Sequence, residues 1–262
     1  MKTLALLLLL AGTAQAQSLE KRIAAAPDGS VRFSFSARPG VFGNGRNSIS
    51  WGCDQGNCRH RQVDDNWDSD DHDWDAPCDS GPVRVALRKS SGRITNLRTY
   101  VGGEWRPNTS ATDLGVVGTK DATSYLLSVA ARDDSRVAEN AIFPAVLADS
   151  VTIWPDLLKM AKDEKVSRKV RRSAVFWLGQ AAGDAATRGL TDLVADGDQD
   201  HEVRESAVFA LSQRPHEEGV PALIRIAKDN KDPDLRRKAI FWLGQSDDPR
   251  ALSLFEELLT KP

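Results

Sequence analysis

The chain has little that would indicate chemistry or a charged partner. Its 262 residues include only three cysteines and four histidines, and 35 Lys and Arg nearly balance 37 Asp and Glu. The near-neutral charge argues against a nucleic-acid-binding protein and provides no polybasic surface for anionic lipid. The HExxH, GxSxG and P-loop motifs of three large enzyme classes are also absent from the sequence. These absences favour a non-enzymatic protein without a cofactor.

The chain has only one long apolar run, at its N-terminus. The stretch MKTLALLLLLAGTAQA at 1–16 combines a basic start, an apolar segment too short to span a bilayer and a small-x-small site. It predicts a cleaved signal peptide, with a retained anchor as the alternative. Because Gln17 rather than a cysteine follows the site, a lipoprotein is not expected. We expect a secreted protein, periplasmic in a Gram-negative bacterium, with no membrane segment after cleavage.

The three cysteines, Cys53, Cys58 and Cys78, lie in the N-terminal half. An exported chain meets an oxidising compartment, so three cysteines predict one disulfide and one spare thiol. Cys53 and Cys58 would close the shortest loop, but spacing alone does not choose the pair. A zinc site would need a fourth ligand such as His60 or His72, and the spacing fits no zinc motif.

The C-terminal half repeats one pattern of two amphipathic segments. Val137, Val170, Val203 and Leu235 occupy equivalent positions at intervals of 33, 33 and 32 residues. The clearest copies of the first segment read SAVFWLGQ, SAVFALSQ and KAIFWLGQ, with apolar residues at helical spacing. One helix pair of this length cannot bury its own apolar face, whereas stacked pairs share a continuous core. The pattern therefore predicts an α-solenoid, and the chain is mainly α.

The repeats carry a recognisable motif. The pattern DxxVRxxAxxAL stands as DHEVRESAVFAL at 200–211 and as DPDLRRKAIFWL at 232–243. It resembles the short bacterial HEAT-like repeats also found in phycobilin lyases, over roughly residues 117–262. The resemblance implies an α-α superhelix in which Asp and Arg of neighbouring units form a polar ladder. The matching residues are Asp200, Arg204, Asp232 and Arg236, whereas Ser167 replaces the Asp and Ala138 the Arg in weaker units.

Phe176–Trp177 and Phe241–Trp242 recur at equivalent positions of two repeats. We interpret them as packing between repeats, with an aromatic binding site as the alternative. Gly179 and Gly244 stand where the first helices should end, as expected of a left-handed C-terminal residue. Asp248 is the expected N-cap of the last helix.

Residues 24–115 differ from the repeats in their apolar pattern, and this pattern predicts a small antiparallel β domain. The expected strands are 30–38, 48–51, 83–88 and 94–101, with a hairpin turn at 90–92. A helix expected at 119–132 starts the solenoid. The β domain is a candidate cover for that end of the stack, which would otherwise face water.

An acidic segment with a cysteine, residues 64–79, interrupts the expected strands. Carboxylates at such density suit calcium, and the candidate ligands are Asp68, Asp70, Asp71, Asp73 and Asp75. An EF-hand counted from Asp71 fails, because Ala76 and Pro82 stand where Gly and Glu are required. We favour a solvated loop, in which Trp67 and Trp74 are candidate partner contacts.

The leading hypothesis is a non-enzymatic exported scaffold that binds a protein or peptide through its repeat surface. We expect that surface on the second helices, at Lys159, Lys162, Arg188, Asp192, Arg225 and Lys228. The alternative is a metal-dependent ligand-binding protein that uses calcium or zinc in the acidic loop 64–79. A third hypothesis is an enzyme with its site between sheet and solenoid. The sequence does not predict the oligomeric state.

Overall fold

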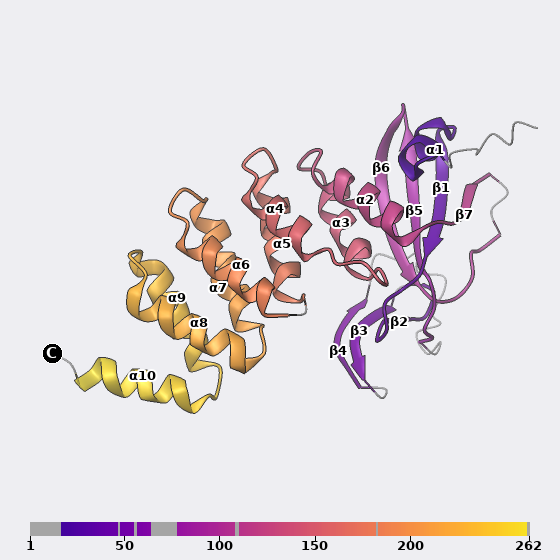
Figure 1. Cartoon of the computed structure of the whole chain (residues 1–262). Helices are drawn as coiled ribbons and strands as arrows, with labels where there is room; N and C mark the ends of the chain where they lie inside the picture. Colours follow the sequence, from indigo (N-terminus) through magenta and orange to yellow (C-terminus); the bar gives the residue numbers. More distant parts are fainter. Residues whose placement is uncertain are drawn as a thin grey trace, which may run out of the picture.

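The computed structural model describes residues 17–46, 48–54, 57–63, 78–107, 110–181 and 183–260. The signal peptide predicted at 1–16 and residues 64–77 of the acidic loop lie outside these ranges. Within them, seven strands form the N-terminal region and nine helices follow, curving away from the sheets to the C-terminal end (Figure 1). None of the described helices combines the length and the apolar character that crossing a membrane requires.

The N-terminal region contains two sheets. The four-stranded sheet has the order β6 (Arg93–Val101), β5 (Val83–Ser90), β1 (Gly29–Phe35) and β7 (Thr112–Val116). The three-stranded sheet has the order β2 (Phe42–Gly43), β3 (Ser48–Asp54) and β4 (Asn57–Val63). All four expected strands are present. The expectation of a purely antiparallel domain is wrong for one pair, because the chain crosses the sheet after β6 and β7 joins β1 in parallel.

One face of the four-stranded sheet packs on the helices. Along β5, Val83, Val85 and Leu87 alternate into the core, as a half-buried strand requires. From β1, the Phe33 ring meets Tyr125 of α2 (Thr119–Ala130) edge-on, with 6.4 Å between centroids. The β region therefore covers the N-terminal end of the helix stack, and one apolar core runs through both.

A short helix, α1 (Leu19–Ala25), precedes the sheet and was not expected from the sequence. Its last turn is held by Lys89, which is buried on the inward face of β5. The ammonium donates hydrogen bonds to the carbonyl oxygens of Ile23, Ala24 and Ala26, at 3.3, 2.6 and 2.6 Å. Free carbonyl groups at a helix C-terminus attract a cation, so this contact anchors α1 to the sheet.

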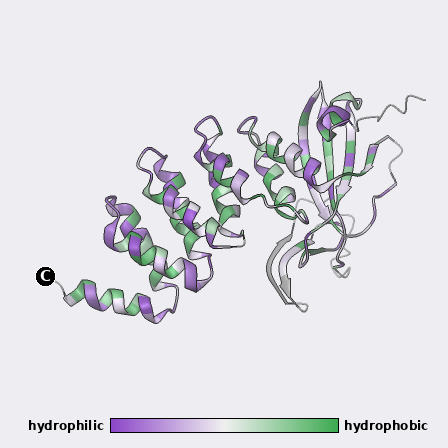
Figure 2. Cartoon of the chain, viewed as in Figure 1, coloured by the Kyte–Doolittle hydropathy of each residue, from purple (hydrophilic) through white to green (hydrophobic). Residues whose placement is uncertain are grey.

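The predicted solenoid of helix pairs is confirmed. After α2, the helices are α3 (Arg136–Val146), α4 (Trp154–Lys162), α5 (Arg168–Gly179), α6 (Asp184–Ala195), α7 (His201–Ser212), α8 (His216–Asp229), α9 (Pro233–Gly244) and α10 (Pro249–Thr260). Here α3, α5, α7 and α9 are called first helices, and α4, α6, α8 and α10 second helices. Apolar residues line the faces where helices meet, and polar residues gather toward the loops (Figure 2).

Each first helix begins at a side-chain cap. Ser167, Asp200 and Asp232 occupy the same position of the repeat, and each accepts a hydrogen bond from a backbone N–H of the first turn. Ser and Asp are both good N-caps. The replacement of Asp by Ser in one unit therefore preserves the helix start, although it removes a charge.

Gly179 has a different role from the one expected. It is the last residue of α5, and Gln180 after it is right-handed, so no left-handed residue ends this helix. A Cβ at position 179 would lie 2.9 Å from the Cβ of Ala210 and 3.1 Å from its carbonyl oxygen. The glycine therefore permits the close approach of α5 to α7. At the equivalent Gly244, the nearest atom is Phe255 Cζ at 4.0 Å.

These two glycines give a matched test. We expect Gly179→Ala to lower the free energy of unfolding by about 1–3 kcal/mol, because the added methyl group overpacks the joint. Gly244→Ala has room and gains about 0.5–1 kcal/mol from better helix propensity. Urea unfolding of the two variants measures both effects, and equal changes would contradict the assigned close approach.

The expected cap at Asp248 is confirmed. Its Oδ1 accepts hydrogen bonds from the Arg250 backbone N–H and Nε, both at 2.9 Å, and Oδ2 accepts one from Nη2 at 2.7 Å. The side-chain and then the backbone hydrogen bonds of Arg250 lower the pKa of Asp248 from an ordinary 3.8 to about 2.

A carboxyl group whose pKa is lower in the folded state stabilises the protein above its unfolded pKa and loses that effect as the pH falls. We expect the gap in unfolding free energy between wild type and Asp248→Asn to be full at pH 7 and to shrink from about pH 4 to about pH 2. Denaturant titrations at several pH values measure the gap. Asp247→Asn is the control, since its exposed carboxylate makes no hydrogen bond within the described structure. A gap for Asp248→Asn that does not change with pH would contradict the assignment.

Candidate functional site

A phenylalanine stands at the same position of every first helix. Phe143, Phe176, Phe209 and Phe241 come from α3, α5, α7 and α9 in turn. Phe143 is only 8% exposed, whereas Phe176 is 37% and Phe241 57% exposed. The row of rings is therefore covered beside the β region and open toward the C-terminal end.

The two tryptophans hold this row together across the joints. Trp177 stacks on Phe143 of the preceding repeat with 5.2 Å between centroids, and Trp242 packs on Phe209 at 5.0 Å. Within each pair, the adjacent Phe and Trp rings lie 5.0 Å apart at 78°. The interpretation as packing between repeats is confirmed for the tryptophans, while Phe176 and Phe241 keep exposed surface.

The β region contributes a third ring to the first joint. Trp51 of β3 lies 5.2 Å from Phe143 and 5.6 Å from Trp177, measured between ring centroids. Both tryptophans are 8% exposed. This aromatic cluster, defined as Trp51, Phe143 and Trp177, fixes the three-stranded sheet against α3 and α5.

Two adjoining hollows follow the first helices. One of about 600 Å³ lies between the β region and α3, α5 and α7, and one of about 750 Å³ lies over α5, α7 and α9. They share Arg172, Ser206 and Phe209, so they form one continuous groove, here called the first-helix groove. No residue of α4, α6 or α8 lines either hollow.

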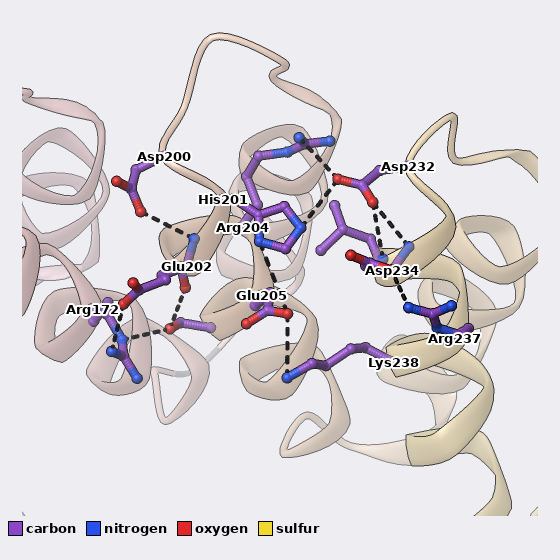
Figure 3. Close-up of polar contacts among 12 residues, drawn as sticks. Arg172, Asp200, His201, Glu202, Arg204, Glu205, Asp232, Asp234, Arg237 and Lys238 are labelled. Carbon is purple, nitrogen blue, oxygen red and sulfur yellow. Dashed lines mark hydrogen bonds and ion pairs between the residues drawn. The ribbon is translucent and has the colours of Figure 1, made fainter.

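Ion pairs between neighbouring first helices line this groove. Arg172 Nη1 lies 3.1 Å from Glu202 Oε2, and Lys238 Nζ lies 3.3 Å from Glu205 Oε1 (Figure 3). Lys169 and Glu139 form an equivalent pair at 3.2 Å. Exposed pairs of this kind contribute about 0–1 kcal/mol each. They balance much of the charge in the groove and leave its aromatic rings as the distinctive feature.

The polar ladder implied by the resemblance has one complete rung. Arg204 Nη1 lies 3.5 Å from Asp232 Oδ2, and its Nε donates to the Val194 carbonyl oxygen at 3.0 Å (Figure 3). Burial opposes ionisation of Asp232, but two backbone N–H donors at the start of α9 and the charges of His201 and Arg204 lower its pKa. The rung therefore joins two repeats and caps a helix with one carboxylate.

The other ladder residues do not form a second rung of this kind. Arg236 donates to the carbonyl oxygens of Asn230 and Lys231 in its own unit, at 2.7 and 3.2 Å. Asp200 has Arg168 at 3.9 Å as its ion-pair partner among the described residues. The ladder is therefore a single rung between α7 and α9 rather than a continuous row.

His201, Asp232 and Asp234 form the one group of metal-ligand type within the described ranges, with one ligand atom of each inside 4.8 Å of the others. The protein already uses the Asp232 carboxylate, since Oδ2 faces Arg204 and Oδ1 accepts backbone N–H groups. A guanidinium at this distance repels a cation, so the group is best explained as part of the rung. The aspartates expected to bind calcium lie outside the described residues.

Comparison with known proteins identifies the repeats. A family model described as HEAT repeats matches residues 187–262. The α region is built of HEAT repeats. Among solved structures, one similar chain belongs to the complex of CpcE and CpcF of phycocyanin lyase from Nostoc sp. PCC7120, with 20% sequence identity and a TM-score of 0.41 over 54% of this chain and 90% of that chain. No curated protein matched the sequence.

The six predicted partner contacts lie on the second helices of the HEAT repeats. All are exposed. Two form ion pairs, Arg188 with Asp184 of the same helix and Lys228 with Glu257 of the next second helix. Their role in binding stays a prediction, because the hollowed surface is formed by the first helices. Helix phase identifies the solvent-facing residues of both sets of helices but not the set that lines a groove. The repeated Phe–Trp pair was the available signal for the groove.

The cysteines are placed only in part. The pairing of β3 with β4 sets the Cα of Cys53 opposite that of Cys58, and Cys78 is exposed with a free thiol. A Cys53–Cys58 disulfide stays a prediction.

Two substitutions of Asp232 test its two roles, the helix cap and the ion pair with Arg204. Asp232→Ser keeps a cap oxygen but loses the pairing with Arg204, whereas Asp232→Ala loses both. We expect unfolding free energies in the order wild type, Ser, Ala, with about 1 kcal/mol between the two variants from the cap. Asp200→Ser should cost less than Asp232→Ser, because Asp200 has only a distant partner. Denaturant unfolding measures the series, and equal losses for Ser and Ala at position 232 would contradict the dual role.

Proposed function

We propose that the protein is a non-enzymatic scaffold that binds a protein or peptide partner in the first-helix groove. The observation that carries this proposal is the continuous groove over three HEAT repeats with Phe176 and Phe241 exposed in it. Exposed aromatic rings in a hollow are typical anchors for a partner. The expected export places this activity outside the cytoplasm.

The composition of the groove supports binding by shape rather than by charge. Three of its cations, Lys169, Arg172 and Lys238, lie 3.1–3.3 Å from Glu residues of neighbouring first helices. The hydroxyl groups of Ser173 and Ser206 also line the groove. A partner therefore gains most binding energy from apolar side chains that contact the rings. Its polar groups would contact the Ser hydroxyl groups and the ion pairs of the groove.

The repeat spacing sets the spacing of such anchors. Neighbouring packed helices lie about 8–10 Å apart, so rings two repeats apart are separated by about 16–20 Å. An extended peptide advances about 3.3 Å per residue. Apolar side chains about six residues apart on an extended partner, which point to the same side, would therefore reach Phe176 and Phe241 together.

A photo-crosslinking amino acid tests which layer binds. Placed at Phe176 or Phe241 in the native cells, it should give adducts of one partner mass, whereas placed at Lys162 or Arg225 on the second helices it should give none. The partner should also be lost when Phe241→Asp is combined with the crosslinker at 176, with the melting temperature of the variant checked separately. Adducts from the second helices alone would overturn the groove and support the surface expected from the sequence.

A further inference from the structure

A separate pocket lies in the β region, on the strands that carry Arg84. Its volume is about 230 Å³, and apart from Arg46 it shares no lining residue with the first-helix groove. It is lined by residues of β1, β5 and β6 and by the segments 45–46 and 104–106. This Arg84 pocket is defined by Arg32, Arg84, Tyr100, Glu104 and Trp105, with Val31 and Ala86 as apolar lining.

Arg84 is the unusual residue of this pocket. It is only 3% exposed, and its Nη2 donates to the Gly45 carbonyl oxygen at 2.8 Å. Its buried Nε makes no hydrogen bond, and within the described ranges no carboxylate lies at ion-pair distance. Burial lowers the pKa of its guanidinium. A buried charge without a counter-charge is costly, and such arginines are usually paired with an acid.

Two other buried cations among the described residues have several partners. Lys89 donates to three carbonyl oxygens, and Arg214 faces Glu218 and several carbonyl groups of the preceding repeat. Arg171 also has a buried Nε without a hydrogen bond, but it lines neither the groove nor this pocket. Arg84 therefore lines a pocket while its buried Nε is unpaired and its charge has no carboxylate at ion-pair distance among the described residues.

Aromatic rings hold the Arg84 guanidinium in place. Its Cζ lies 4.8 Å from the centroid of Trp105 and 5.6 Å from that of Tyr100. Stacking of this kind fixes the plane of the guanidinium and leaves its edge for an acceptor in the same plane. Arg32 also faces Trp105, at 5.1 Å, but its Nε is already used by Asp113 at 2.8 Å.

We propose that the Arg84 pocket binds the carboxylate of a small organic acid. The guanidinium edge of Arg84 donates to the carboxylate, and the rings of Trp105 and Tyr100 contact the organic part of the ligand. A carboxylate is planar and carries one negative charge, so it can bind in the plane of the Arg84 guanidinium along one edge. The exposed carboxylate of Glu104 at the pocket disfavours anions of higher charge, so inorganic phosphate is the weaker ligand. The proposal does not depend on the function assigned to the groove.

Benzoate is the probe, and ¹H–¹⁵N NMR of the full-length folded protein is the measurement. We expect saturable shifts of the backbone signals of Gly45, Gly103 and Trp105 with benzoate. Benzamide, its neutral isostere, should bind at least tenfold more weakly, and so should inorganic phosphate. Equal binding of benzamide would show an apolar pocket only and overturn the proposal. Preference for phosphate, or no saturable binding of any probe, would overturn it as well.

Variants assign the effect to Arg84. Arg84→Lys should weaken benzoate binding at least tenfold, because one ammonium group cannot present a planar edge. Arg88→Lys, on an exposed site of the same strand, is the control and should leave the affinity unchanged. If Arg84→Lys does not fold, Trp105→Leu replaces it, with a loss of at least threefold expected from the missing ring. Unchanged benzoate affinity in a folded variant at either position would contradict the assignment.

Discussion

The contact of Trp51 with Phe143 and Trp177 is the constraint on which the arrangement of the molecule depends. It joins β3 of the three-stranded sheet to α3 and α5, with 5.2–5.6 Å between ring centroids. Backbone hydrogen bonds support the same joint, from Arg38 N–H to the Leu147 carbonyl and from Asp149 N–H to the Ser36 carbonyl, at 2.8 and 3.0 Å. Because the sheet is fixed there, it forms the closed end of the first-helix groove.

The same kind of contact recurs along the stack with different consequences. Trp242 packs on Phe209 as Trp177 packs on Phe143, but none of the described strands covers this second joint, and Phe241 stays 57% exposed. The ring contacts between repeats are therefore alike, but the β region covers only the first of these two contacts. A groove that is closed at one end and open at the other results from this difference, and its exposed rings are available to a partner.

The repeats could be predicted from the sequence because their stability is local. The apolar spacing, the caps and the Phe–Trp pairs each describe contacts between neighbours about 33 residues apart. Four strands and the hairpin turn followed from alternation and turn residues in the same way. The Lys89 cap of α1, the parallel β7 and the Arg84 pocket depend on residues distant in sequence, and a local pattern gives no signal for them. The groove over the first helices was not expected either, since both helices of a repeat are amphipathic.

A double-mutant cycle between Trp51 and Trp177 tests the central claim most directly. The free energies of unfolding of Trp51→Ala, Trp177→Ala and the double variant are compared with that of the wild type. Ring contacts of this kind contribute about 0.5–1.5 kcal/mol beyond the area they bury, so a coupling energy of that size is predicted. A coupling energy of zero within about 0.3 kcal/mol would contradict the account, because the sheet would then not be fixed to the repeats through these rings.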